Sequence, residues 1–169
     1  MKKAFFSLVA LFLFFALPVQ ASETRPVRLI IPSIPINTVL EPVNTTPEGT
    51  VDVPIDPVNA AWFEQSVHPG EKGTSIIDGH FGWKNGIPAV FDFLNKIRLG
   101  DKIYIVDEMG ATTTFIVRKL KIYRENEDSS GVFYSNDGIA HLNLITCEGV
   151  WDKAKKSYSG RLVVFADME

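Results

Sequence analysis

Short runs of β-branched and aromatic residues, each bounded by turn residues, are the feature that most restricts how this chain can fold. Such runs favour β-strands, because these side chains pack well on a pleated surface. Helical spacing of apolar residues marks one short segment, 88–97. Many strands with only short helices predict a mainly β fold, and we expect a closed β-barrel. The expected strands cover residues 27–31, 74–77, 102–106, 112–123, 141–146 and 161–166.

Proline, glycine and other turn residues predict the conformation of the segments between these strands. Ile34-Pro35-Ile36 is predicted to be extended, since prolines hold their surroundings in β or polyproline geometry. Residues 41–57 are rich in Pro, Thr, Asp and Gly, which predicts loops around a short strand near 51–53. Asp56-Pro57 has the pattern of a capped helix start and predicts a short helix over 59–65. The other expected connections are a hairpin turn at 107–111 and a long polar loop at 124–138.

The first residues form a targeting segment. Lys2 and Lys3 precede an almost unbroken apolar run over 4–19, and Val19-Gln20-Ala21 offers small residues for a signal peptidase. Residues 1–21 are therefore predicted to be a secretory signal peptide, or alternatively a membrane anchor that holds the chain through residues 4–19. Both alternatives place residues 22–169 outside the cytoplasm, as one domain.

Charge and composition exclude some classes of partner. The 169 residues include 17 basic and 20 acidic side chains, and the basic ones are scattered rather than gathered into a stripe. This distribution argues against a nucleic-acid-binding protein. The chain has no internal repeat, and we expect a monomer.

Cys147 is the chain's single cysteine and cannot form an internal disulfide. A free thiol outside the cytoplasm is either used or buried as a small hydrophobe. Cys147 follows the apolar run Leu142-Asn143-Leu144-Ile145-Thr146 and precedes Glu148-Gly149. It is thus expected where a strand ends and a loop begins, a common place for catalytic groups. This context favours a nucleophile over a structural cysteine.

A cysteine nucleophile needs a proton acceptor, usually a histidine. His141 lies six residues before Cys147 on the same expected strand, roughly 20 Å away, and is too far. His68 precedes an apparent Pro-Gly turn and is expected to be a solvated surface residue. His80 follows an expected strand and is the best partner. Arg161 begins the last strand and could stabilise an oxyanion, although an ordinary strand-edge arginine is the alternative.

Several motifs, in order across residues 27–166, make the sequence resemble the sortase family, most closely its class F branch. This resemblance implies an eight-stranded β-barrel and a Cys-His-Arg site, which carried over by position consists of Cys147, His80 and Arg161. One departure is Asn143, where the family's cysteine motif usually opens with Thr. The motifs are Leu29-Ile30-Ile31-Pro32, Gly79-His80, Pro88-Ala89-Val90-Phe91, Gly100-Asp101, Leu144-Ile145-Thr146-Cys147 and Arg161-Leu162-Val163-Val164.

The resemblance also implies an activity. Cys147 would cleave an LPxTG-like sorting signal, form a thioacyl enzyme, and pass the peptide to an amine at the cell surface. The implied partners are surface proteins that carry the sorting signal, and an amine acceptor that is either a cell-wall precursor or a protein lysine. No cofactor is expected. The acidic residues at 125–128 are interpreted as solvated charge, so no metal is expected either.

Four further side chains are candidates for substrate contacts, each with a structural alternative. Thr146 either bonds the substrate or satisfies the strand end, and Glu148 contacts substrate or Arg161, or is a solvated loop acid. Trp83 and Trp151 either wall the peptide groove or pack elsewhere.

Two rival functions remain open from the sequence. One is a secreted cysteine peptidase, in which water alone resolves the thioacyl intermediate. The other is a non-catalytic β-barrel binding module whose cysteine is structural. An L,D-transpeptidase is disfavoured, because the chain lacks a Ser-x-Gly-Cys motif and a histidine shortly before it.

Overall fold

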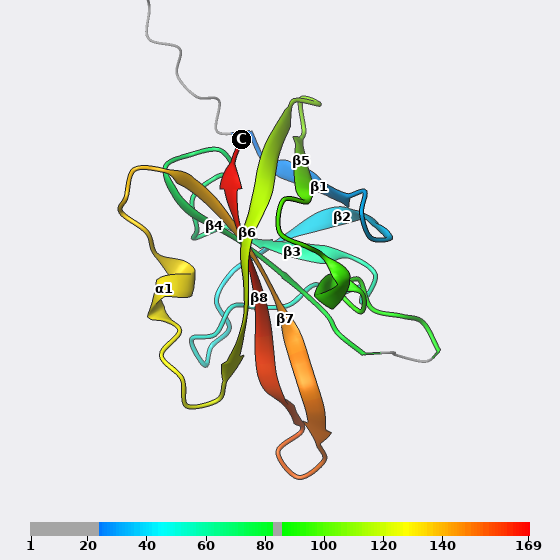
Figure 1. Cartoon of the computed structure of the whole chain (residues 1–169). Helices are drawn as coiled ribbons and strands as arrows, with labels where there is room; N and C mark the ends of the chain where they lie inside the picture. Colours follow the sequence, from blue (N-terminus) through cyan, green and yellow to red (C-terminus); the bar gives the residue numbers. More distant parts are fainter. Residues whose placement is uncertain (1–23, 83–85) are drawn as a thin grey trace, which may run out of the picture.

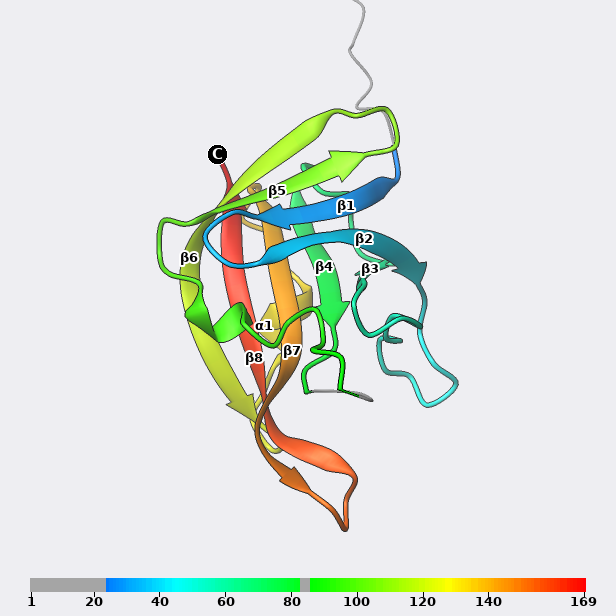
Figure 2. The ribbon, with the colours of Figure 1, turned by 90° about the vertical axis from the view of Figure 1, so that its right-hand side faces the viewer.

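The computed structural model describes residues 24–82 and 86–169, and this part of the chain forms a closed barrel of eight strands. The order around the barrel is β1-β2-β3-β4-β7-β8-β6-β5, and β5 closes it by pairing with β1 (Figures 1 and 2). The mainly β prediction and the closed barrel are confirmed. The strands are β1 (Pro26–Ile31), β2 (Ile36–Val43), β3 (Ala60–Phe63), β4 (Gly73–Gly79), β5 (Lys102–Asp107), β6 (Thr112–Arg124), β7 (Ala140–Asp152) and β8 (Ser157–Met168).

The pairing of β4 with β7 brings distant parts of the chain together. These two strands run parallel, in register from the Gly73–Ala140 pair to the Gly79–Thr146 pair. A parallel pair needs a long crossover, and here the crossover contains β5 and β6. Beyond the barrel, β7 and β8 continue as a two-stranded hairpin, drawn in orange and red (Figure 1).

Alternating side chains of β7 pack on two different faces. Leu142 and Leu144 point into the barrel core, whereas Ile145 joins a smaller outer cluster. This cluster is covered by α1 (Ser130–Phe133), whose Val132 is buried. Asn143, which faces outward from β7, donates from Nδ2 to the Val132 carbonyl at 2.6 Å. The residue that departs from the sortase motif therefore anchors the helix that lies beside the outer face.

The predicted helix over 59–65 is wrong, because this segment contains β3. Asp56 and Pro57 do begin a turn, in which the Asn59 amide donates to the Asp56 carbonyl at 3.0 Å. The chain then leaves the turn extended and pairs with β2 and β4. Ladder hydrogen bonds to strands on both sides, together with burial of Trp62, outweigh the local capping pattern.

Residues 88–97 form turns and a single 3-10 turn, η1 (Leu94–Lys96), rather than a regular helix. Their apolar spacing is used for burial all the same, since Phe91, Leu94 and Ile97 close one end of the barrel core. The loop predicted from residue 41 is also shorter than expected, because β2 continues to Val43. The predicted hairpin of residues 102–106 and 112–123 is confirmed by β5 and β6.

The predicted targeting segment, residues 1–21, lies outside the described residues. No helix within residues 24–82 and 86–169 has the length and apolarity that a membrane span needs.

His141 forms an ionic cluster near the start of β7, at the end of the strand away from Cys147. Its Nδ1 donates to Asp167 at 2.8 Å, and its Nε2 donates to Asp137 at 3.0 Å. Burial opposes protonation, but hydrogen bonds to the two carboxylates raise the pKa of His141 above its ordinary value. The protonated His141 therefore contributes its full stabilisation of the fold below about pH 6.5, the ordinary histidine pKa. This contribution is lost as the pH rises through the raised pKa of His141.

The substitution His141→Gln is expected to lower the free energy of unfolding more at acid pH than at alkaline pH. We expect a loss of about 1 kcal/mol at pH 5.5 that shrinks toward pH 9, because the cluster is partly exposed. Urea unfolding at both pH values measures it. His68→Gln serves as control, because the ring of His68 bonds the Thr24 carbonyl and packs on Trp62. A loss of equal size at both pH values would contradict the ionic role.

Candidate active site

Cys147 lies within β7, so the prediction that the strand ends at this residue is wrong. The β7–β8 pairing continues through a bulge between Glu148 and Trp151, where Gly149 adopts a φ of +93°. Left-handed backbone of this kind favours glycine. The neighbouring strand β4 does end here, with Gly79 opposite Thr146. Cys147 is thus held by β8 on one side and is accessible on the side that β4 has left.

His80 immediately follows β4, and the parallel register places it beside Cys147 at the ends of neighbouring strands. Its backbone is fixed, because the Phe91 amide donates to the His80 carbonyl at 3.0 Å. Gly79 lies against the Phe91 ring, and a Cβ at this position would overlap the ring. This packing explains the glycine of the Gly-His motif. The imidazole Nε2 of His80 lies 2.9 Å from the Pro54 carbonyl.

Arg161 faces Cys147 directly across the β7–β8 ladder. Paired residues in a ladder project from the same face of the sheet, so the guanidinium and the thiol share the outer face. Arg161 donates from Nη1 to the Gly160 carbonyl at 3.0 Å, and no carboxylate of the described residues forms a salt bridge with it. Its remaining N–H donors are available to a bound group.

The thiol of Cys147 is half-buried, and this burial raises its pKa. The positive charge of Arg161 opposes the shift, whereas the negative charge of Asp78 adds to it. Burial and the charge of Asp78 therefore favour the uncharged thiol over the thiolate. A nearby base must take its proton during any attack on a substrate.

Asp78 is a residue of this site that the sequence reasoning missed. It lies opposite Ile145 in the β4–β7 ladder, two residues before His80, and faces the outer side with Cys147. Among the described residues, no group is hydrogen-bonded to its carboxyl. Burial raises the pKa of Asp78 to about 8, against the opposing attraction of Arg161. The period-2 spacing from His80 was the signal that could have identified it.

Removal of the Asp78 charge should make Cys147 more reactive. In Asp78→Asn, we expect alkylation of the single cysteine by iodoacetamide to shift to lower pH. At pH 8 the rate should rise on the order of a few-fold, since a nearby carboxylate disfavours the thiolate. The folded-state pKa of Asp78 is raised to about 8. Wild type therefore loses stability as the pH rises from about 4, the ordinary aspartate pKa, to about 8, because the buried carboxyl then has to ionise. The variant should therefore be more resistant to urea than wild type at pH 8.

The control for this prediction is Asp52→Asn, which changes an exposed acid that caps the Val53 amide. It should leave the alkylation profile unchanged. Equal alkylation rates in wild type and Asp78→Asn across the pH range would show that Asp78 does not influence the thiol.

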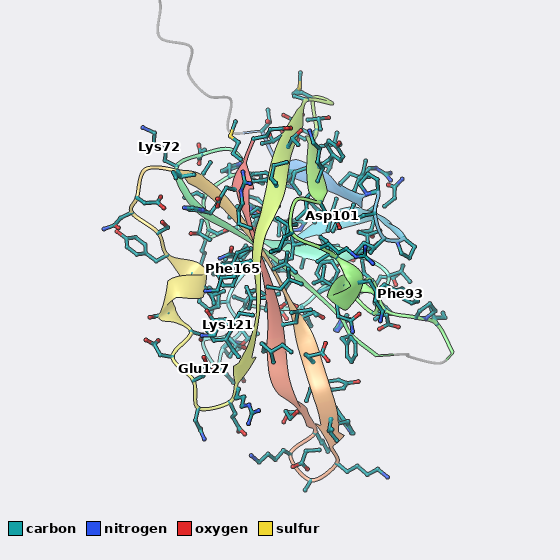
Figure 3. The ribbon with its side chains drawn as sticks, viewed as in Figure 1. Lys72, Phe93, Asp101, Lys121, Glu127 and Phe165 are labelled. Atoms are coloured by element: carbon teal, nitrogen blue, oxygen red, sulfur yellow. The ribbon has the colours of Figure 1, made fainter. Side chains whose placement is uncertain are left out.

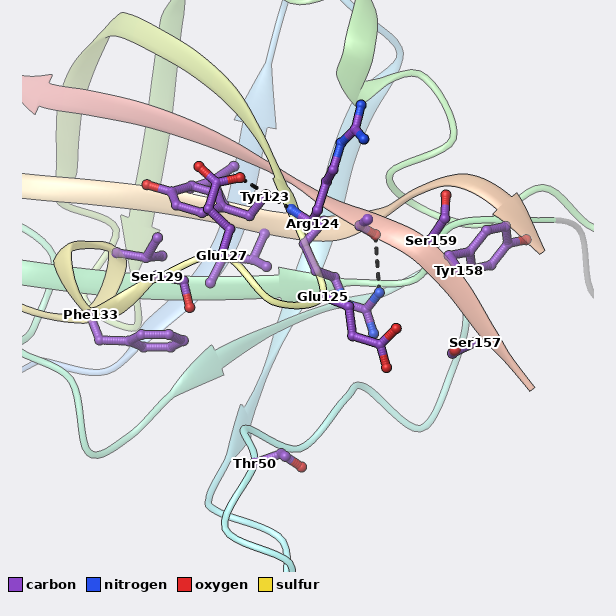
Figure 4. A pocket seen from close by; sticks show the side chains of 15 residues that line it. Thr50, Tyr123, Arg124, Glu125, Glu127, Ser129, Phe133, Ser157, Tyr158 and Ser159 are labelled. Carbon is purple, nitrogen blue, oxygen red and sulfur yellow. Dashed lines mark hydrogen bonds between the residues drawn. The ribbon is translucent and has the colours of Figure 1, made fainter. Parts of the chain in front are cut away.

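A hollow of about 480 Å³ extends from Arg161 along the outer face. Its floor includes Ile145 and Val163, and Tyr123 and Glu127 line one side. Figure 4 shows Tyr158 and Ser159 of β8 toward one end, with Thr50 across from them. Apolar floor residues with hydroxyl groups around them suit an extended peptide segment.

Two ion pairs fix the segment between β6 and β7 beside this hollow. Lys121 contacts Glu127 at 2.5 Å (Figure 3), and Lys155 contacts Glu125 at 2.7 Å. Glu125 and Glu127 thus have lysine partners, whereas Asp128 accepts from the Ser130 amide at 2.9 Å. Within residues 24–82 and 86–169, no three His, Cys, Asp or Glu side chains gather as a metal site would require. The absence of a metal stays a prediction.

The four candidate substrate contacts fall in different places. Thr146 is buried, and its hydroxyl donates to the Gly79 carbonyl at 2.7 Å, which ties β7 to the strand before His80. Glu148 lines a hollow with Lys121 and Leu162, on the opposite face from Arg161. Trp151 is exposed and packs edge-on against Tyr158, which in turn contacts Phe81. Trp83 lies outside the described residues. Substrate contacts by these four residues stay predictions.

The other two histidines lie elsewhere. His68 is half-buried against Trp62, with ring centroids 4.8 Å apart, so the expectation of a solvated side chain is wrong. His141 belongs to the ionic cluster described above. Among the described histidines, only His80 lies at the end of the barrel that carries Cys147.

Comparisons with known proteins agree on one family. A family model described as a sortase domain matches residues 29–169. No curated protein matches the chain. Similar solved structures include sortase C-1 from Actinomyces oris, at 22% identity and a TM-score of 0.63 over 85% of this chain and 74% of that one. Sortase C1 from Streptococcus agalactiae is 20% identical, with a TM-score of 0.66 over 89% and 70% of the two chains.

A third similar structure is the sortase D5 transpeptidase from Clostridium perfringens, at 21% identity and a TM-score of 0.63 over 86% of this chain and 79% of that one. At identities this low, the structural similarity shows a common fold and nothing further. The similar structures named here are of the C and D types, so the class F resemblance stays a prediction.

Proposed function

The chain belongs to the sortase family, and from this premise we propose that it is a cysteine transpeptidase that cleaves an LPxTG-like sorting signal. Cys147 is the nucleophile, His80 exchanges the protons, and Arg161 stabilises the oxyanion. The thioacyl enzyme then transfers its peptide to an amine.

One observation carries this proposal. Cys147 and Arg161 are paired across the β7–β8 ladder, and His80 follows directly after the end of β4 on the other side of Cys147. Acyl transfer by a cysteine needs a base for the thiol and a donor for the oxyanion, and an imidazole on one side with a guanidinium on the other can supply both. A structural cysteine would need neither neighbour.

In the first half of the reaction, each of the three residues has one role. His80 takes the proton of the thiol while Sγ attacks the scissile carbonyl carbon. The carbonyl oxygen becomes an oxyanion on the Arg161 side and accepts hydrogen bonds from the guanidinium. When the C–N bond breaks, His80 returns the proton to the leaving amine and the thioacyl bond remains.

The second half of the reaction reverses these roles. An incoming amine attacks the thioacyl carbon from the side that the first amine left, and it loses its proton to His80. Collapse of the tetrahedral intermediate expels the sulfur, which recovers that proton. The new amide contains the peptide and the amine, and the enzyme is regenerated. Water in place of the amine gives hydrolysis alone.

The hollow beside Arg161 receives the peptide segment that becomes the acyl group. Its apolar floor of Ile145 and Val163 suits apolar side chains of a sorting signal. The substrates are surface proteins that carry the signal, and the acceptor is a cell-wall precursor or a protein lysine. An extracytoplasmic location, through a signal or anchor at residues 1–21, follows from this role.

Quenched fluorescent peptides of the Leu-Pro-x-Thr-Gly type, with and without an added amine, test the proposal. Mass spectrometry should detect a thioacyl adduct on Cys147 and a peptide–amine product. Cleavage without transfer to any amine offered would favour the peptidase alternative. If no peptide reacts and the folded protein also resists alkylation, the non-catalytic binding module would replace this proposal.

A further inference from the structure

His80 is oriented by a backbone carbonyl rather than directly by an acid. The imidazole Nε2 lies 2.9 Å from the Pro54 oxygen. Because a carbonyl only accepts hydrogen bonds, Nε2 must carry a proton and donate it. Nδ1 is then the nitrogen that remains for proton exchange with Cys147. Whatever holds the Pro54 carbonyl in place therefore sets the tautomer of His80.

The same peptide group that accepts from His80 donates to a carboxylate. The Pro54 carbonyl and the Ile55 amide belong to one peptide unit, and the Ile55 amide donates to Glu41 at 2.9 Å. An N–H and a C=O point in opposite directions across a trans peptide. Glu41, the Pro54–Ile55 peptide and His80 therefore form one continuous hydrogen-bonded chain, which ends at the base of the active site.

Glu41 is itself well fixed and negatively charged. It lies on β2 opposite Ala61 of β3, and Asn59 donates to its second oxygen at 2.7 Å. Burial works against ionisation, but hydrogen bonds from Asn59, Ile55 and Asp56 and the charge of His80 lower the pKa of Glu41. The carboxylate is thus ionised at neutral pH, and its attraction to a protonated His80 is mutual.

Pro54 is buried, so the part of this loop that depends on the carboxylate is the orientation of the Ile55 amide. The Ile55 side chain is 92% exposed and contributes no packing to hold its own peptide. Two other bonds tether the loop further along: Thr38 to the Val58 carbonyl at 2.7 Å, and Val90 to the Pro57 carbonyl at 2.9 Å. Loss of Glu41 should therefore let the plane of the Pro54–Ile55 peptide turn, while buried Pro54 and these two bonds keep the loop in place.

We propose that Glu41 is a positioning residue that acts through the Pro54–Ile55 peptide to hold the His80 imidazole in its reactive tautomer. This inference rests on the proposed function of His80. An anion bonded to the amide polarises the peptide and makes its carbonyl a stronger acceptor. The arrangement corresponds to an acid–histidine pair with one peptide group between the two partners.

The test compares Glu41→Gln with the matched control Glu64→Gln in the full-length chain. Glu64 anchors the other end of the same loop, because it accepts from Asn44 at 2.9 Å, but among the described residues no hydrogen bond links it to His80. In Glu41→Gln, kcat for peptide cleavage should fall roughly 10- to 100-fold with KM little changed.

Imidazole ¹H–¹⁵N correlation spectra provide a readout that is independent of substrate. Wild type and Glu64→Gln should show the Nε2-protonated tautomer of His80, and Glu41→Gln should show a mixture. If His80 has the same spectrum in all three proteins, the proposal is wrong even if the enzyme is a transpeptidase. If the tautomer changes as expected but no peptide is cleaved by wild type, the positioning role stands and the proposed function fails. Equal losses of kcat in both variants would show that each carboxylate only stabilises the loop, and this result would overturn the proposal.

Discussion

Cys147→Ala is expected to lose peptide cleavage by about 10⁴-fold or more, because no other group in the site can form the thioacyl bond. Cys147 is the only cysteine of the chain, so no neighbouring thiol can substitute for it. Cleavage assays with the fluorescent peptides measure the loss, and mass spectrometry should find no adduct in the variant.

The fold should survive this substitution. Cys147 is half-buried and outside both hydrophobic clusters, so its truncation should cost roughly 1 kcal/mol or less. Urea unfolding of both proteins checks this point and separates loss of chemistry from loss of structure. Residual cleavage within tenfold of wild type by a folded Cys147→Ala would mean that the thiol is not the nucleophile.

Arg161→Gln is expected to lower kcat/KM for cleavage by about 10²- to 10³-fold, the usual effect of removing an oxyanion donor. The loss should fall mainly on kcat, because the bond to Arg161 strengthens as the carbonyl oxygen acquires charge. Arg161→Lys should recover only part of the activity, since an ammonium lacks the planar fork of the guanidinium. Steady-state kinetics of the three proteins measure these differences.

Arg118→Gln is the control for charge alone. Arg118 lies on β6 and pairs with Asp167 at 3.5 Å, in the ionic cluster at the far end of β7. Its replacement should leave kcat unchanged. If Arg161→Gln retains kcat within threefold and changes only KM, Arg161 binds the peptide and does not stabilise the oxyanion.

Local sequence patterns predicted the secondary structure correctly where the strands that a segment pairs with favour the same conformation as its own residues. The alternating runs of β5 and β6 pair as the expected hairpin, and the run that leads to Gly79-His80 is β4. The glycine of the Gly-His motif has a tertiary reason, since the Phe91 ring leaves no room for a side chain at Gly79. The choice of Cys147 and His80 came from their types and contexts, that of Arg161 also needed the resemblance to the sortase family, and the roles of all three await the measurements above.

Local patterns misled where pairing with distant strands decides the structure. Residues 60–63 follow a helix-start signal but form a strand, because β2 and β4 offer hydrogen bonds on both sides. Cys147 precedes Glu148-Gly149, which suggests a loop, yet β8 holds the chain extended through a glycine bulge. In both cases, backbone pairing over long sequence separations outweighs the preference of a few residues.

The sequence by itself determined the β class, the order of His80, Cys147 and Arg161, and the uniqueness of the thiol. Only the tertiary structure decided which other groups surround them. Asp78 comes near the thiol because β4 pairs with β7 across a crossover of some 60 residues, from Gly79 to Ala140. Glu41 reaches His80 through the Pro54–Ile55 peptide, a contact that no spacing rule predicts. Side-chain types are local information, whereas the charges and hydrogen bonds that tune a site depend on which distant strands the barrel places side by side.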